Sequence, residues 1–150
     1  MKFFFLFLPF ISFQAFACPQ LAGVYKVCRS STDQNKTAEV IVEQKIVNKY
    51  CQYTITTRDS ETENARVEKY TADGKMKIVS DTDSDTGITI RTETLATHQN
   101  DILTIKMNAT LDSEAFADVT IKASKVGSQF TQIFSGISMG EPVSDTIICQ

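Results

Sequence analysis

The segment 136–140 has the spacing Gly-x-Ser-x-Gly, which in α/β-hydrolases holds a nucleophilic serine on a sharp turn between a strand and a helix. That chemistry needs a histidine after the serine, as general base. The single histidine of the sequence, His98, precedes Ser138. We therefore expect no serine hydrolase and no enzyme. Gly136 and Gly140 are expected to bend a late strand or loop, and His98 to lie on the surface of a polar connection.

An acidic segment at 81–87 is the best candidate for an ion site. Asp81, Asp83 and Asp85 alternate with hydroxyl residues, and carboxylates in a tight loop can converge on calcium. An EF-hand loop has glycine at its sixth position, whereas Gly87 is the seventh residue of this segment. We expect a solvated acidic hairpin, with the three aspartates as weak calcium candidates, and no cofactor.

Four cysteines offer a different chemistry. They are Cys18, Cys28, Cys51 and Cys149, and no two of them have the Cys-x-x-Cys spacing typical of zinc sites. An even number of cysteines in an exported chain favours two structural disulfides. Three pairings are open, and any bridge from Cys149 ties the end of the chain to its beginning. Lipidation of Cys18 is the alternative, and it would leave one thiol unpaired.

Export is indicated by residues 1–17. Lys2 supplies a positive start, residues 3–13 are apolar but too short to span a bilayer, and Ala15 and Ala17 are the small residues that signal peptidase requires. We expect cleavage after Ala17, no transmembrane anchor after cleavage, and a secreted or periplasmic protein. The formal net charge of the whole chain is −3, without a run of Lys or Arg. This charge argues against nucleic acid as a partner.

The elements that must position these residues are predicted to be strands. Period-two alternation dominates residues 18–150, and segment 101–111 is the clearest case, with Leu103 and Ile105 on one face and Thr104 and Lys106 on the other. Further strands are expected at 21–28, 38–47, 50–58, 64–71, 75–80, 86–97, 115–123, 129–138 and 143–149.

Short turn signals separate these segments, such as the hairpin dipeptide of Asp73 and Gly74. Short gaps favour an antiparallel meander of about 8–10 strands, which closes into a small barrel to avoid exposed edges. We expect a single disulfide-stapled all-β domain over 18–150. A β-sandwich is the alternative fold, and residues 112–118 have a short capped helix as their alternative.

The segment 21–25, Leu-Ala-Gly-Val-Tyr, resembles the start of lipocalin-like proteins, where a Gly-x-Trp motif begins the first strand of an up-and-down barrel. Tyr25 stands in place of the tryptophan. No arginine follows Arg91 to pack over that ring from the last strand. The resemblance implies a small secreted barrel of the calycin type.

The inward faces of such a barrel decide whether it holds a molecule. Small residues such as Ala109 and Ala117 leave room for an apolar pocket, and a core filled by larger neighbours is the alternative. The pocket candidates are Tyr25, Leu103, Met107, Ala117, Ile121, Phe130 and Phe134. We expect a non-catalytic carrier of a small hydrophobic ligand, or alternatively an envelope-associated or extracellular module with a filled core that binds a protein partner.

Overall fold

The computed structural model describes residues 18–33, 37–59 and 64–150, so the predicted signal peptide at 1–17 lies outside the described residues. Within the described residues the chain forms ten strands and no helix. The strands are β1 (Gly23–Ser30), β2 (Thr37–Val47), β3 (Tyr50–Asp59), β4 (Ala65–Ala72), β5 (Met76–Thr82), β6 (Thr89–Gln99), β7 (Ile102–Leu111), β8 (Glu114–Val126), β9 (Gln129–Ser138) and β10 (Glu141–Cys149).

All ten strands belong to one antiparallel sheet with the order β4-β3-β2-β1-β10-β9-β8-β7-β6-β5. The predicted all-β meander is confirmed. Because β1 pairs with β10 in the middle of the sheet, the first and last strands are neighbours, and β4 and β5 form its two edges. A β-sandwich would need two separate sheets, whereas here all ten strands form one continuous sheet.

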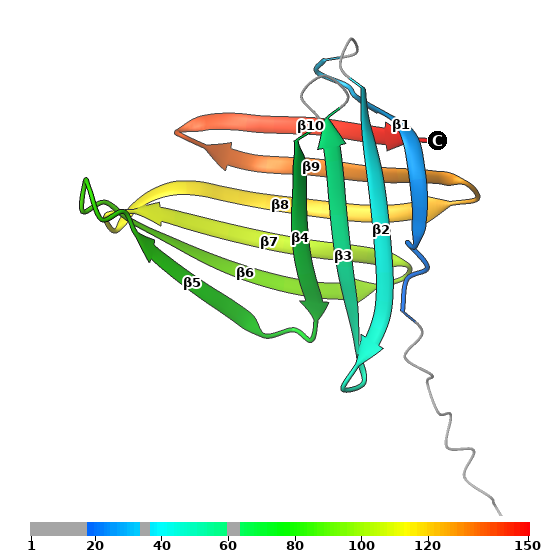
Figure 1. Cartoon of the computed structure of the whole chain (residues 1–150), viewed down its shortest axis with the longest axis horizontal. Coiled ribbons are helices and arrows are strands. Elements are labelled where there is room, and N and C mark those ends of the chain that lie inside the picture. Colours follow the sequence, from blue (N-terminus) through cyan, green and yellow to red (C-terminus); the bar gives the residue numbers. More distant parts are fainter. Residues whose placement is uncertain (1–17, 34–36, 60–63) are drawn as a thin grey trace, which may run out of the picture.

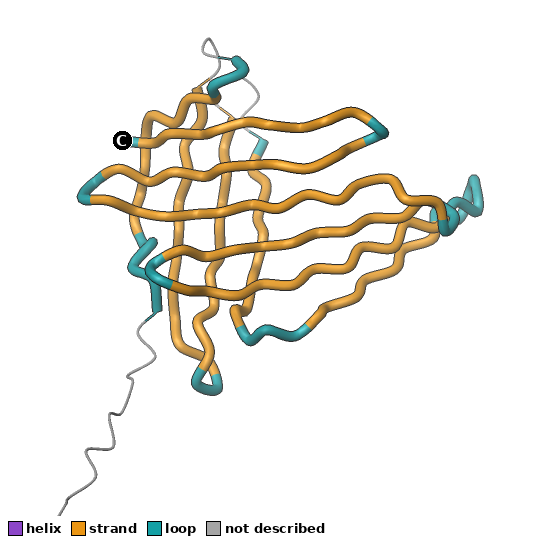
Figure 2. Tube along the Cα trace, turned by 180° about the vertical axis from the view of Figure 1, so that it is seen from behind, coloured by secondary structure: helices purple, strands orange, loops and turns teal. Residues whose placement is uncertain are grey.

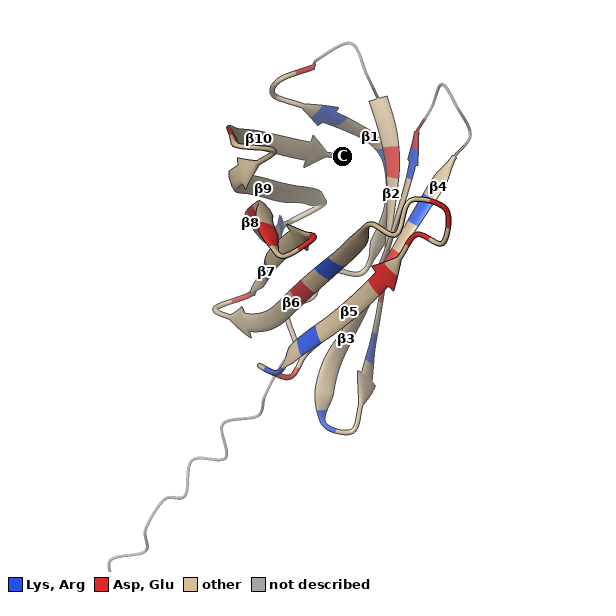
Figure 3. Cartoon of the chain, turned by 90° about the vertical axis from the view of Figure 1, so that its left-hand side faces the viewer, with Lys and Arg blue, Asp and Glu red and all other residues tan. Residues whose placement is uncertain are grey.

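The sheet curls strongly at β1. Its β1–β4 part runs across the direction of β5–β10 (Figures 1 and 2). The register of β1 against β2 shifts between Tyr25 and Cys28, and such a bulge bends a strand and increases its twist. The result is a half-barrel, seen from the side in Figure 3, with β7–β10 in one wall and β2–β4 in the other.

The hydrophobic core lies where the two walls cross. Period-two alternation supplies it, as in β3, where Cys51, Tyr53 and Ile55 are buried and the residues between them are not. The largest fully buried side chains include Tyr53 from β3, Phe130 from β9 and Leu21 from the segment before β1. Burial on both walls holds the curl.

Two disulfides fasten this core. Cys28 in β1 is bonded to Cys149, its direct partner in β10, and Cys18 is bonded to Cys51 in β3. No free cysteine remains among the described residues. The Cys18 bond uses the sulfur that lipidation would need, so the structure favours disulfides over that alternative.

Two local expectations differ from the structure. Residues 112–118 form no helix, because Asp112 and Ser113 adopt positive φ angles of 47° and 74° in a tight turn and β8 begins at Glu114. His98 lies within β6 rather than in a connection, because the strand continues its alternation to Gln99. In the described part of the chain there is no helix of the length and apolarity that a membrane span requires.

Candidate functional site

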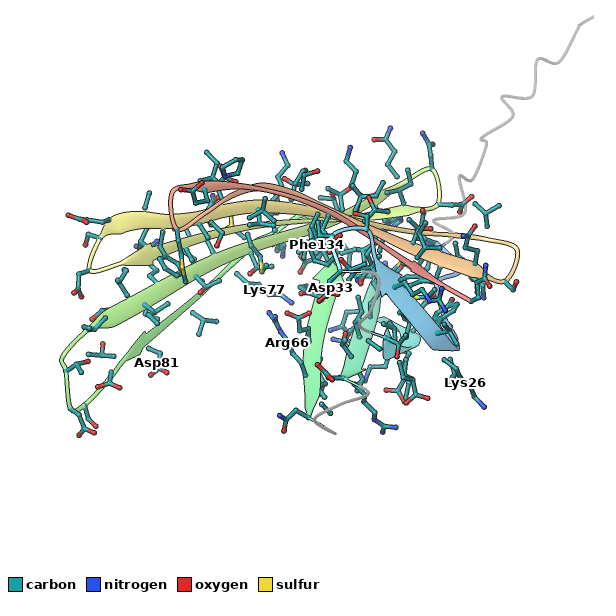
Figure 4. The ribbon with its side chains drawn as sticks, turned by 90° about the horizontal axis from the view of Figure 1, so that it is seen from above. Lys26, Asp33, Arg66, Lys77, Asp81 and Phe134 are labelled. Atoms are coloured by element: carbon teal, nitrogen blue, oxygen red, sulfur yellow. A yellow bond between two sulfur atoms is a disulfide. The ribbon has the colours of Figure 1, made fainter. Side chains whose placement is uncertain are left out.

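A cavity of about 610 Å³ opens on the concave face of the half-barrel. It lies between β3 and β4 on one side and β7–β10 on the other, beside the buried core. Figure 4 shows Phe134 and Arg66 on this concave side. The volume is in the range that holds a small organic molecule.

One wall of the cavity is apolar. Strand pairing places Met107 opposite Val119 and Ile121 opposite Phe134, so that adjacent strands present a continuous hydrocarbon surface. These four side chains line the cavity with Ile105, Val143 and Ile147. Met107, Val119 and Phe134 are only partly buried and pack at the margin of the core, which leaves their outer surfaces available to a ligand.

The facing wall is polar and comes mainly from β4. Arg66 Nη2 lies 2.7 Å from Glu68 Oε1, and the Tyr70 hydroxyl is hydrogen-bonded to Glu68. Burial, followed by the charge of Glu68 and its hydrogen bond, raises the pKa of Tyr70 far above its ordinary value. Tyr70 therefore stays a neutral phenol at physiological pH. Thr57, Asp59 and Asn64 complete the polar lining of this wall.

Two aromatic rings, one from β1 and one from β9, stack in the core of the half-barrel. Tyr25 stacks on Phe130, with ring centroids 4.8 Å apart, and the Tyr25 hydroxyl donates to the Leu21 carbonyl at 2.8 Å. A Cβ at Gly23 would lie 2.9 Å from the Tyr25 ring, so glycine lets that ring fold back against its own strand. The Gly-x-Tyr spacing thus has a packing role.

Lys125, from β8, covers the same tyrosine. Its Nζ lies 5.7 Å from the Tyr25 ring centroid and donates to the Ala22 carbonyl at 3.0 Å. This is a cation–π contact at the start of β1. The lipocalin resemblance implied an arginine from the last strand over this ring, and here a lysine from an earlier strand makes the contact.

The sequence-predicted pocket residues divide into two groups. Met107, Ile121 and Phe134 line the cavity. The other four lie outside the cavity lining: Tyr25, Leu103 and Phe130 are buried in the core, and Ala117 lies toward the open end of β8, paired with Ala109 and Ser138.

Sequence reasoning missed the polar wall. Arg66, Glu68 and Tyr70 alternate along the predicted strand 64–71, which indicated that they share one face. Nothing in the spacing showed that this charged face would turn inward. Buried Gln132, which also lines the cavity, was missed for the same reason.

A second, smaller cavity of about 200 Å³ lies where the edge strands β4 and β5 approach each other. Lys69, Lys75 and Lys77 line it with Glu68 and Tyr70. The basic side chains make this seam positively charged.

The other motifs have local structural roles. Ser138 ends β9, where it pairs with Ala117 and Glu141, and Gly140 lies in the following turn, so the segment is no strand-to-helix elbow. His98 lies beside a disulfide, with its Nε2 3.5 Å from Cys51 Sγ.

The acidic segment 81–87 forms a turn. Asp83 accepts hydrogen bonds from the backbone N–H groups of Asp85 and Thr86 and from the Thr86 hydroxyl. The Thr86 bonds are the main reason why the pKa of the Asp83 carboxyl is lowered. No group of three or more His, Cys, Asp or Glu side chains with metal-binding geometry occurs in the ranges that the structure describes. Calcium binding by Asp81, Asp83 and Asp85 stays a prediction.

No protein-family model, curated protein or solved structure matches this chain. The fold and the site together define an antiparallel β half-barrel with two disulfides and an open concave cavity. This architecture is compatible with a lipocalin-like fold.

Proposed function

We propose that the protein is an exported, non-catalytic carrier that binds a small amphipathic molecule on the concave face of its lipocalin-like half-barrel. The observation that carries the proposal is the contrast between the two walls of the 610 Å³ cavity. An apolar wall removes hydrocarbon from water, and a polar wall orients the other end of the ligand.

The apolar wall supports a hydrocarbon component. Met107, Val119 and Phe134 come from three successive strands and are partly exposed in the cavity. Burying hydrocarbon against them contributes about 25 cal/mol per Å² of apolar surface. A flexible methionine beside an aromatic ring adapts to differently shaped chains.

The polar wall supports a polar end group on the same ligand. The Arg66 side chain is 75% exposed, against 27% for Glu68, so Arg66 can donate hydrogen bonds to a ligand without breaking a buried contact. The Glu68 carboxylate adds an acceptor, and so does the oxygen of the neutral Tyr70 phenol, whose proton is donated to Glu68. A purely apolar ligand would leave these groups unused.

Export and the absence of catalysis are parts of the same proposal. Two disulfides are typical of oxidising compartments such as the periplasm or the cell exterior. The chain's histidine pairs with Leu103 in β7 and contacts the Cys51 sulfur, whereas Ser138 pairs with Ala117 in β8. These positions give Ser138 no base from His98.

Fluorescence titration with dansyl-labelled undecanoic acid tests the proposal. The probe should gain intensity and shift to the blue as its tail enters the cavity. Val119→Trp fills the space between the walls and should weaken binding at least tenfold. Ile133→Trp is the matched control, because Ile133 is 45% exposed and lies on the convex face of β9.

Equal binding by the wild type and Val119→Trp would contradict the cavity as the site. Absence of probe binding by the folded wild type would instead favour the alternative expected from sequence, a module whose surface meets a protein partner. Displacement of the probe by dodecan-1-ol and by dodecanoate, which share one hydrocarbon tail, then separates the contribution of the tail to binding from that of the polar end group.

A further inference from the structure

Strand β5 presents an open edge. In the described sheet it pairs with β6 on one side, and all seven of its residues are exposed. Lys77 and Val79 line the 200 Å³ cavity beside β4, the opposite edge of the same sheet, and β5 diverges from β4 along its length (Figure 1). An edge strand of this kind displays unpaired N–H and C=O groups that can pair with another strand.

The sequence of β5 is complementary to itself in the antiparallel direction. Its register with β6 places Lys77, Val79 and Asp81 on the concave face, opposite Thr94, Thr92 and Ile90. Figure 4 shows Lys77 and Asp81 on this side of the molecule. If a two-fold axis passes through Val79, Lys77 of one copy lies opposite Asp81 of the other, and this ion pair occurs twice.

We propose that β5 is a dimerisation edge, at which two copies of this chain join their sheets through antiparallel β5–β5 pairing centred on Val79. A two-fold contact of this kind is self-complementary and closes after two copies. The charges select the second copy as the occupant, because oppositely charged cross-strand pairs stabilise an antiparallel pair whereas like charges destabilise it.

Apolar burial favours the same register. Val79, Ile78 and Met76 are 66%, 54% and 48% exposed. In the proposed pairing Val79 packs against Val79 of the second copy. Ile78 lies opposite Ser80 and Met76 opposite Thr82, and both of these are uncharged. A register centred on Ser80 would place Val79 opposite Asp81 instead, which loses both ion pairs. The Lys77–Asp81 and Val79–Val79 pairs therefore favour the register centred on Val79 over the one centred on Ser80.

This interface is independent of the proposed carrier function. None of the residues of β5 lines the 610 Å³ cavity. A protein that dimerises but does not bind dansyl-labelled undecanoic acid would support the interface without the carrier function. A monomer that binds this probe would support the carrier function without the interface.

Sedimentation equilibrium of the disulfide-intact protein tests the proposal through a charge swap. Lys77→Asp and Asp81→Lys each replace two attractive pairs by two repulsive ones, and each should weaken dimerisation by about 10- to 100-fold. The double variant Lys77→Asp/Asp81→Lys restores opposite charges and should dimerise like the wild type. Circular dichroism confirms that each variant is folded.

Mixing the two single variants gives the sharpest readout. Each is expected to be monomeric alone, and an equimolar mixture should form a heterodimer, because every charge then faces its opposite. A wild type that stays monomeric at high micromolar concentration would overturn the proposal. Single variants that dimerise as well as the wild type would also overturn it.

Discussion

The ring of Tyr25 stacks on the ring of Phe130, with centroids 4.8 Å apart and planes inclined by 20°. Tyr25 lies in β1 just before the bulge, and Phe130, the second residue of β9, pairs with Cys149 of β10. The contact therefore joins the two parts of the sheet at the place where it curls. Neither ring lines the 610 Å³ cavity.

Phe130→Ala should destabilise the fold by about 3–5 kcal/mol, because Phe130 is fully buried and its removal leaves a cavity beneath Tyr25. Ile133→Ala, on the convex face of the same strand, should cost less than about 1 kcal/mol. Urea unfolding with the disulfides intact measures both values. Similar losses for the two variants would show that the stacked pair does not hold the corner.

Gly136→Ala should be among the most damaging small substitutions. The backbone of Gly136 has a φ of 151°, and a Cβ there would overlap the Asp118 carbonyl oxygen of β8. Gly127 also has a positive φ, 61°, but a Cβ would meet open space there. We expect about 3 kcal/mol or more for Gly136→Ala and about 1–2 kcal/mol for Gly127→Ala, by thermal unfolding. Equal losses would mean that backbone strain alone matters.

The two disulfides should contribute unequally to stability. Cys28–Cys149 closes a loop with a sequence separation of 121, and Cys18–Cys51 closes one of 33. In the chain-entropy model the longer loop removes more freedom from the unfolded chain, by about 1 kcal/mol. The pair variant Cys28→Ala/Cys149→Ala should unfold at lower urea than Cys18→Ala/Cys51→Ala. The reverse order would contradict this account.

Asp145 should make the fold sensitive to acid. Burial alone would raise the pKa of its carboxyl, but hydrogen bonds from Ser30, Ser31, Thr146 and Thr32 outweigh burial and lower it. Because the folded pKa lies below the unfolded value of about 3.9, the stabilisation is present above pH 4 and is lost as the pH falls through the folded pKa.

Asp145→Asn removes this titration. The variant should be less stable than the wild type at pH 7, and the difference should shrink at pH 3. Urea midpoints at the two pH values measure it. A difference that does not change with pH would mean that the Asp145 hydrogen bonds have no charge dependence.

The strands were predictable because one face of each strand packs on the core and the other meets water. Leu103 and Ile105 alternate with Thr104 and Lys106, and the observed β7 begins and ends within a residue of the predicted segment. The strand β6 continues through His98 to Gln99, although the polar residues 98–101 predicted a connection there. Local alternation thus determines where strands form.

The cavity and the cysteine pairing depend on contacts between distant parts of the chain. Alternation placed Met107 and Phe130 on inward faces alike, but only the curl at β1 buries Phe130 and leaves Met107 partly open. Cys28 meets Cys149 because β1 pairs with β10. Nothing in the local sequence specifies either contact.

Methyl NMR during a titration with dodecanoate tests the central claim, that the concave cavity binds an amphipathic molecule, most directly. We predict that the methyl signals of Met107, Val119 and Ile121 shift as dodecanoate is added, whereas those of Ile133 and Ile137 on the convex face do not. Shifts confined to the convex face, or no saturable shift at Met107 and Val119, would contradict the claim.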